Sequence, residues 1–156
     1  NTGVAGAIAE EIHVLDLLVS KDAVQYDMDA TEFGYPLGQI PREEDLAFPA
    51  EERMIEKALA VGKTMQGFHT FLGRVVTGDC FVSSQEKKEF LRKEFQASCC
   101  EMEGAAIAQI ARKNGVPFLI LRFISEEANT KAPMTYTEFE RKAIAQSVDF
   151  VLEFLK

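Results

Sequence analysis

Apolar and polar positions change along the chain in blocks that predict alternating strands and helices. Residues 14–26, 71–82 and 97–102 hold short apolar and β-branched runs, which are typical of strands. Residues 116–124 (VPFLILRFI) are almost continuously apolar, which favours a central strand covered on both faces. We therefore expect these four segments to pair in one sheet.

Helix signals fall between these strands. Pro49 opens a helical pattern that runs to about Val61, where a glycine ends it. The segment 83–86 (SSQE) has a capping-box sequence and starts a helix that runs to about Phe95. Residues 104–113 are predicted to be helical, and the Asn-Gly pair after them ends that helix.

A last helix begins at a second capping box, Thr137 to Glu140, and runs to the end of the chain. Its apolar positions recur at helical spacing and lie on one face: Ile144, Val148, Leu152 and Leu155. Because strands alternate with helices, the pattern favours an α/β fold with a mixed or mostly parallel sheet. No repeat or linker interrupts the chain, so residues 1–156 are interpreted as a single domain.

Two segments are predicted to be irregular. Residues 1–7 (NTGVAGA) have the small residues of a glycine-containing turn, which in α/β folds normally follows a strand. Residues 27–41 are rich in Gly, Pro and Asp and are predicted to form a loop. Phe33 and Tyr35 within this loop indicate a pocket or an interface.

Composition narrows the function classes. The chain has 156 residues and a formal net charge of −8, so it lacks the basic footprint of a nucleic-acid-binding or membrane-surface protein. No apolar run approaches the ~20 residues that a membrane span needs. Twelve phenylalanines and 47% hydrophobic residues argue against disorder. We expect neither nucleic acid nor membrane as a partner.

The cysteines and histidines show no ligand or disulfide spacing. The three cysteines, Cys80, Cys99 and Cys100, are odd in number and form no CxxC pair, which predicts a reducing, cytoplasmic compartment. His13 and His69 are far apart in sequence and have no partners at ligand spacing. No metal ion or organic cofactor is expected.

Candidate chemistry collects where predicted strands end, the place where α/β sheets bind ligands. Four such segments are residues 3–6, 77–82, 101–103 and 125–129, and they carry carboxylates rather than phosphate-binding cations. Paired carboxylates suit glycosidic bond cleavage, in which one group protonates the leaving group and another supports an oxocarbenium-like transition state. Arg122 lies inside an apolar strand and needs a charged partner.

The residues alone leave several alternatives open. Glu101 and Glu103 share a strand face, or one of them caps the following helix. Arg122 pairs with one of these glutamates, either as a structural ion pair or to orient a ligand. Phe81 stacks on a ring or fills the core. The adjacent pair Cys99 and Cys100 is interpreted as inert packing, because no His or Lys stands nearby in sequence to activate it.

These segments resemble the methylthioadenosine/S-adenosylhomocysteine nucleosidases of the nucleoside phosphorylase superfamily. The resemblance covers essentially the whole chain, in family order and spacing. Its motifs are NTGxAG at 1–6, DxDxTxFGY at 27–35, TGDxF at 77–81, EMEGAAIA at 101–108 and RxIS at 122–125. It implies a three-layer sandwich with a mixed, mostly parallel, twisted central sheet flanked by helices. It also implies hydrolysis of an N-glycosidic bond, with adenine and a thioribose as products.

The resemblance implies a role for each matching residue. Glu103 binds the ribose hydroxyls and stabilises positive charge on the sugar, and Met102 packs on the ribose. Phe81 stacks on adenine, and the backbone of Val82 contacts the base edge. The remaining implied substrate-binding residues are Val4, Ala5, Gly6, Glu101, Arg122, Ser125, Tyr136 and, from the partner subunit of a homodimer that meets at loop 27–41, Phe33.

Three departures from the family pattern carry consequences. The acid that protonates adenine is an aspartate in the family and Glu126 here, so its carboxyl group is displaced by about 1.5 Å, and shifts of ~1 Å can cost ~100-fold in rate. In the glycine turn, Val4 stands where the family often has a residue with a side-chain hydroxyl group. The first third of the family chain, with the first strands and the water-activating glutamate, is expected to be absent. We therefore expect an apolar sheet edge, poor folding or self-association, and no turnover by these 156 residues.

Other functions remain as alternatives. A purine nucleoside phosphorylase of the same superfamily would use phosphate in place of water and would need arginines. A catalytically inactive relative would bind adenine nucleosides without cleaving them. A plain interaction domain is disfavoured by the ordered set of strand-end motifs.

Overall fold

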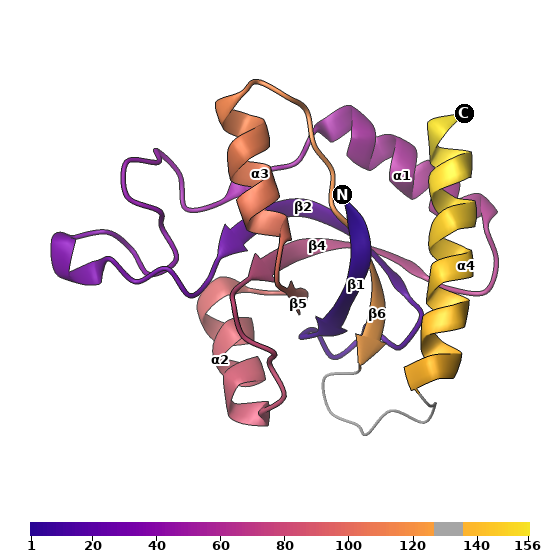
Figure 1. Cartoon of the computed structure of the whole chain (residues 1–156), viewed down its shortest axis with the longest axis horizontal. Helices are drawn as coiled ribbons and strands as arrows, with labels where there is room; N and C mark the ends of the chain where they lie inside the picture. Colours follow the sequence, from indigo (N-terminus) through magenta and orange to yellow (C-terminus); the bar gives the residue numbers. More distant parts are fainter. Residues whose placement is uncertain (127–135) are drawn as a thin grey trace.

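The computed structural model describes residues 1–126 and 136–156, and the side chains of 1–125 and 141–156 (Figure 1). The described strands are β1 (Thr2–Ala7), β2 (Leu17–Gln25), β3 (Phe48–Pro49), β4 (Thr70–Thr77), β5 (Cys99–Glu101) and β6 (Leu121–Glu126). The described helices are α1 (Glu52–Thr64), α2 (Gln85–Phe95), α3 (Gly104–Lys113) and α4 (Tyr136–Leu155), with a short 3-10 helix at Thr31–Phe33. Strands therefore alternate with helices, as the sequence pattern predicts.

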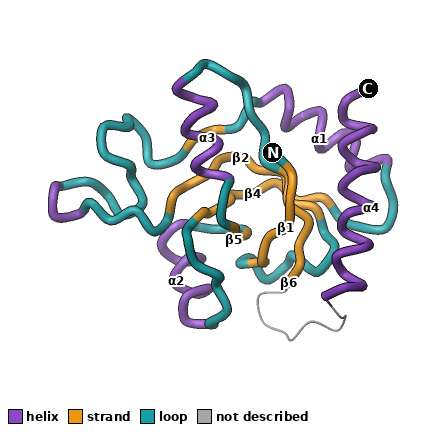
Figure 2. The backbone as a smooth tube through the Cα atoms, in the orientation of Figure 1, coloured by secondary structure: helices purple, strands orange, loops and turns teal. Residues whose placement is uncertain are grey.

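The strands form one mixed sheet that closes on itself. In the described residues the strand order is β3-β2-β4-β5-β1-β6, and β6 also pairs with β2. The closing contact is antiparallel and joins Leu17–Val19 to Leu121–Phe123. Figure 2 shows the strands gathered at the centre, with α2 and α3 on one side and α1 and α4 on the other.

This closure corrects the expected open sandwich. The sheet is mixed, because β1 runs parallel to β6 and antiparallel to β5. However, β1, β2, β4, β5 and β6 each have neighbours on both sides within the described residues. The apolar edge that missing first strands would leave is therefore not observed at β1 or β6, since the first residues of β2 occupy that position.

Three apolar clusters connect the sheet to its helices. One lies beneath α3 and includes Leu18, Val75 and Ile124. A second lies beneath α1 and α4 and includes Phe123 and Phe150. A third lies beneath α2 and is built from the residues Ile8, Val24, Val76, Leu91 and Phe95. Burial on both sides of the sheet explains why the predicted strands are apolar rather than alternating.

Several element boundaries differ from the sequence prediction. Residues 2–7 form a strand and not a turn, because backbone pairing with β5 and β6 outweighs the weak strand propensity of Gly and Ala. The last strand begins at Leu121 rather than at residue 116. Helix α1 begins at Glu52, because Phe48–Pro49 pairs with β2 instead. Helices α2 and α3 span the predicted residues, and the Ser84 hydroxyl caps α2 by accepting from the Lys87 backbone N–H at 3.2 Å.

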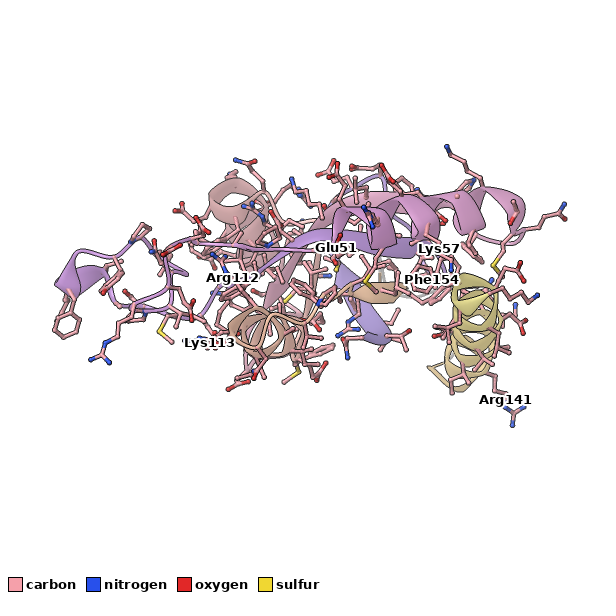
Figure 3. The ribbon with its side chains drawn as sticks, turned by 90° about the horizontal axis from the view of Figure 1, so that it is seen from above. Glu51, Lys57, Arg112, Lys113, Arg141 and Phe154 are labelled. Carbon is pink, nitrogen blue, oxygen red and sulfur yellow. The ribbon has the colours of Figure 1, made fainter. Side chains whose placement is uncertain are left out.

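Helix α4 packs through a different face from its most regular apolar stripe. Ala143 and Phe150 are buried against the sheet, and the Lys57 ammonium of α1 lies over the Phe154 ring at 5.4 Å (Figure 3). The stripe of Ile144, Val148, Leu152 and Leu155 is exposed, with fractions between 51% and 71%. None of the described helices has the length and apolar character needed to cross a membrane.

Candidate active site

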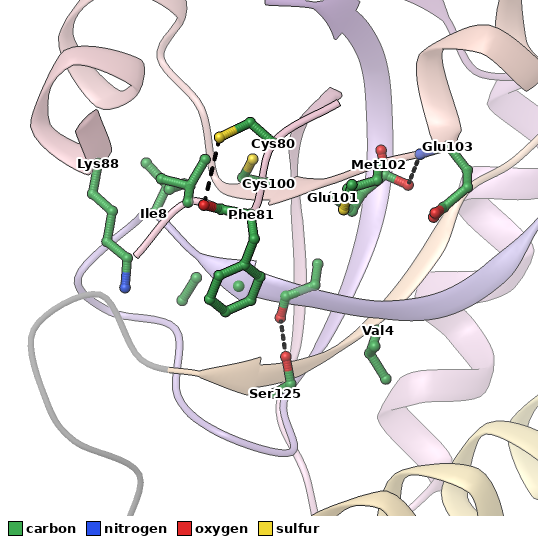
Figure 4. Close-up of a pocket in the computed structure, with 14 residues that line it drawn as sticks. Val4, Ile8, Cys80, Phe81, Lys88, Cys100, Glu101, Met102, Glu103 and Ser125 are labelled. Atoms are coloured by element: carbon green, nitrogen blue, oxygen red, sulfur yellow. Dashed lines mark hydrogen bonds between the residues drawn. The ribbon is translucent and has the colours of Figure 1, made fainter. Parts of the chain in front are cut away.

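The predicted strand-end segments meet at one pocket. A cavity of about 190 Å³ opens between the end of β1, the segment after β4, the end of β5 and the end of β6 (Figure 4). It brings together nine residues singled out from the sequence: Val4, Ala5, Gly6, Phe81, Val82, Glu101, Met102, Glu103 and Ser125. The segments that the strand-end rule singled out therefore lie together at one cavity, although they are far apart in the chain.

Glu101 is the centre of a buried hydrogen-bond network below the pocket. Glu101 is 5% exposed, and its Oε1 and Oε2 accept from the Gly104 backbone N–H at 2.9 and 2.8 Å. It also accepts from the Glu103 N–H at 3.3 Å and from the Thr77 hydroxyl. Of the two glutamates, Glu101 is thus the one whose side chain caps α3, a position where a negative charge is favourable.

Arg122 supplies the positive charge that balances Glu101. Its side chain is 1% exposed, and its Nε donates to Glu101 Oε2 at 3.1 Å while Nη2 makes a second contact to the same oxygen. The Arg122 Nη2 atom also lies 3.8 Å from Glu103 Oε2. The expectation that Arg122 pairs with these glutamates is confirmed. Arg122 does not line the pocket itself and acts from behind it.

Glu103 presents its carboxylate to the open side of the site. It occupies the N-cap position of α3 without a side-chain cap bond, and its side chain is 65% exposed. The two carboxylates therefore differ in environment, since one is buried and ion-paired while the other is accessible to a ligand. This separation of roles is what a site with a structural and a ligand-binding carboxylate requires.

Apolar side chains line the other walls. Phe81 is 67% exposed and Met102 is 44% exposed, so neither belongs to the core. The alternative in which Phe81 fills the core is wrong, because the residue follows β4 in a loop at the pocket rim. Exposed apolar groups beside a cavity are a common mark of a ligand site.

Ser125 joins the ends of β6 and β1. Its hydroxyl donates to the Ala5 backbone oxygen at 3.1 Å (Figure 4). Val4, on the same strand as Ala5, is 46% exposed. The side chains of Glu126 and Tyr136 lie outside the described residues. The loop 27–41 projects from the body of the molecule (Figure 1). Phe33 in this loop is 83% exposed and does not line the pocket.

Five residues that line the pocket were not among the predicted site residues: Ala7, Ile8, Cys80, Lys88 and Cys100. Helical spacing could have pointed to Lys88, because it lies on the same buried face of α2 as Leu91 and Phe95. Lys88 is 6% exposed. A cation on an apolar helical face indicates either a buried partner or a ligand site.

The adjacent cysteines Cys99 and Cys100 are not activated nucleophiles. Burial raises the pKa of the Cys100 thiol to about 12, and the Glu101 charge adds to this effect. Burial also raises the pKa of Cys99 well above its ordinary value. The interpretation of this pair as packing residues is consistent with these directions. Within the described part of the chain, no group of three His, Cys, Asp or Glu side chains could hold a metal ion.

The fold and site together define a class. A closed α/β sheet holds a pocket with an exposed aromatic ring, a thioether and an accessible carboxylate above an ion-paired one, which suits a nucleoside-binding protein. The sequence model of the phosphorylase superfamily matches residues 1–156, and the chain belongs to this superfamily.

Named relatives refine the comparison. The 5'-methylthioadenosine/S-adenosylhomocysteine nucleosidase of Staphylococcus carnosus is 40% identical over 157 residues, which cover 100% of this chain and 68% of the relative. The aminodeoxyfutalosine nucleosidase of Helicobacter pylori is 42% identical over 152 residues, with 96% and 64% covered. A solved structure of a Helicobacter pylori methylthioadenosine nucleosidase variant, with 5'-methylthioadenosine in its active site, matches with a TM-score of 0.88 and 38% identity, over 98% of this chain and 65% of that one. The chain thus spans about two thirds of the length of these relatives.

Proposed function

We propose that the protein hydrolyses the N-glycosidic bond of methylthioadenosine and S-adenosylhomocysteine, releasing adenine and a thioribose. The observation that carries this proposal is the pocket at which Phe81, Met102 and Glu103 meet, above the buried Glu101–Arg122 pair. Relatives with nucleosidase names at 40% and 42% identity support the same reaction class.

Four residues that line the pocket have a place in the proposed complex. Phe81 stacks on adenine, a contact of ~1–3 kcal/mol for a base on an aromatic ring. The Val82 backbone meets the base edge, and Met102 packs on the ribose. Glu103 accepts hydrogen bonds from the ribose hydroxyls. Its negative charge then stabilises the positive charge that develops on the sugar as the bond to adenine breaks.

The proton balance of the reaction needs an acid and a base. In the proposal Glu126, positioned by Ser125, protonates N7 of adenine, which leaves as the neutral base. Water adds to the anomeric carbon and loses a proton to a base. Glu101 is unsuitable as that base because Arg122 and the α3 backbone engage it, and Glu103 is assigned to the ribose.

We therefore propose that the water-activating glutamate belongs to a part of the whole protein outside these 156 residues. The 156-residue chain then binds the nucleoside but releases adenine at least ~100-fold more slowly than the complete gene product, which is the lower end of the contribution of a general base. Equal rates for the two would show that the base lies within the chain.

Phosphorolysis is the main competing reaction. A phosphate co-substrate calls for arginine or several cations, and among the described residues of the pocket Lys88 is the one cation. Hydrolysis proceeds without phosphate, whereas phosphorolysis requires it. A binding-only relative would hold the nucleoside without releasing adenine.

The test is adenine release by the complete gene product in phosphate-free buffer. Methylthioadenosine, S-adenosylhomocysteine and aminodeoxyfutalosine are compared as substrates, because one relative is named for the last of these. Release without phosphate from either thioether supports the proposal. Release that depends on phosphate identifies a phosphorylase, and tight binding without release identifies a binding-only protein.

We also propose a homodimer that meets at loop 27–41, with Tyr136 and the partner subunit's Phe33 lining the space for the alkylthio group. The exposure of Phe33, which is 83%, supports this arrangement. Light scattering of the parent and of Phe33→Asp tests it, since the substitution should yield monomers.

Three free cysteines support a reducing, cytoplasmic location.

A further inference from the structure

Thr77 connects three elements beneath the pocket. It is the last residue of β4 and is 1% exposed. Its hydroxyl donates to Glu101 Oε1 and accepts from the Ala105 backbone N–H at 2.8 Å. One hydroxyl therefore joins the end of β4, the carboxylate at the end of β5 and the first turn of α3.

The Glu101 carboxylate has little orientational freedom left. A carboxylate offers about four acceptor positions. Gly104 donates to both oxygens, Arg122 donates to Oε2, and the Thr77 hydroxyl occupies the remaining side of Oε1. Loss of the hydroxyl would leave Oε1 with one donor fewer and the buried Ala105 N–H without its acceptor.

The orientation of Glu101 determines where Glu103 stands. The Glu103 backbone N–H donates to Glu101 Oε2 at 3.3 Å, and the Arg122 guanidinium lies near both carboxylates. A rotation of Glu101 would therefore move both the backbone and the charged neighbour of Glu103. A displacement of ~1 Å in a positioned group is enough to weaken its function strongly.

The base-binding side of the pocket is anchored separately. The Asp79 backbone N–H donates to Asp27 Oδ2 at 2.8 Å, and the Gly78 N–H donates to the Glu101 backbone oxygen at 3.2 Å. Neither bond uses the Thr77 side chain. The segment that carries Phe81 thus keeps its own supports when the hydroxyl is removed.

We propose that Thr77 is a positioning residue that holds Glu103 for the ribose through Glu101, without touching the ligand. The inference rests on the proposed function, because it assigns the ribose to Glu103. It predicts that loss of the Thr77 hydroxyl weakens binding of the sugar half of a nucleoside and leaves binding of the base unchanged. A residue that only stabilised the fold would weaken both.

Calorimetric titration of the complete gene product tests the proposal with two ligands, adenine and the 7-deaza analogue of methylthioadenosine. The analogue has no N7 to protonate and therefore resists cleavage. Thr77→Val keeps the side-chain shape but removes the hydroxyl, and Thr77→Ser keeps the hydroxyl. If the valine variant does not fold by circular dichroism, Thr77→Ala replaces it, because alanine places no methyl group against Glu101.

Thr70→Val is the matched control. Thr70 is the first residue of the same strand, and its buried hydroxyl oxygen has no hydrogen-bond partner among the described residues. We expect this variant to bind both ligands like the parent. We expect Thr77→Val to bind the nucleoside analogue ~10-fold or more weakly and adenine within ~2-fold of the parent, with Thr77→Ser close to the parent.

Each other result overturns the inference. Equal losses for adenine and the analogue would assign Thr77 to the fold alone, and unchanged binding in Thr77→Val would show that Glu103 does not depend on it. A complete parent protein that binds neither ligand refutes the proposed function, and the inference fails with it. A parent that binds the analogue while Thr77→Val behaves normally leaves the proposed function intact and refutes only the role of Thr77.

Discussion

Replacing Glu101 by Gln tests how much the negative charge beside Arg122 contributes to the free energy of unfolding. The substitution keeps the shape of the side chain and an acceptor for the α3 backbone, but it removes the negative charge beside Arg122. Because the Arg122 side chain is 1% exposed, its guanidinium has almost no access to water. The variant therefore leaves a buried positive charge without its main partner.

The magnitude follows from the geometry. At the 3.1 Å between Arg122 Nε and Glu101 Oε2, two unit charges attract by about 5 kcal/mol at an effective dielectric constant of about 20. Glu103 is 3.8 Å from Arg122 and 65% exposed, so solvent screens most of its compensation. Removing one partner of a buried pair costs about 3–5 kcal/mol, and we expect Glu101→Gln to fall in this range.

Urea unfolding followed by circular dichroism measures the effect. With a denaturant dependence of about 2 kcal/mol per molar, the midpoint should fall by about 2 M. Adding Arg122→Met to Glu101→Gln should restore at least half of the loss, because the stranded charge is then gone.

The same substitution at an exposed ion pair is the control. Glu10 contacts Arg92 at 2.7 Å, but its side chain is 64% exposed. Glu10→Gln should therefore cost less than about 1 kcal/mol. If Glu101→Gln unfolds within about 0.5 M of the parent, or if both variants lose equally, the reasoning about the buried pair is refuted.

Three further predictions concern the pocket, the thiols and the exposed helix face. Phe81→Ala should weaken binding of both adenine and the nucleoside analogue by ~10-fold or more in calorimetry, because the stacking surface is lost; unchanged adenine affinity would contradict the assignment. Iodoacetamide at pH 8 should label Cys80 but not Cys100, because burial raises the pKa of Cys100 to about 12 and the reactive thiolate forms only near that pH or on unfolding. Similar labelling rates for the two cysteines, read by mass spectrometry, would refute this. Replacing Ile144 and Leu152 by Lys should change the free energy of unfolding in urea by about 0.5 kcal/mol or less, since both side chains are exposed; a large loss of stability would show that the face packs within the chain.

The local elements could be predicted from the sequence because their signals are local. Helix α2 begins within the predicted capping segment, although its cap is Ser84 and not the Ser83 of the predicted box, and α3 begins directly after the EME segment. The pocket could also be predicted, since the strand-end rule needs only the order of elements. The pairing of Arg122 with a glutamate could be predicted as well, because a charge inside an apolar strand must be neutralised.

Closure of the sheet had no comparable signal. The pairing of Leu17–Val19 with Leu121–Phe123 joins residues about one hundred positions apart. The sequence of neither strand predicts the other as its pairing partner. The sequence also predicts a turn at residues 1–7, because Gly and Ala have weak strand propensity. Pairing with β5 and β6, which are distant in sequence, gives these residues their strand conformation. On α4, the regular stripe from Ile144 to Leu155 is exposed, because the helix packs through Ala143 and Phe150.

The most direct test of the central claim is adenine release from methylthioadenosine by the complete gene product, with Glu103→Gln measured beside it. The account predicts release in phosphate-free buffer and a loss of ~100-fold or more in the variant, because the charge that stabilises the developing sugar cation is gone. Release that requires phosphate, or a Glu103→Gln variant as active as the parent, would contradict it.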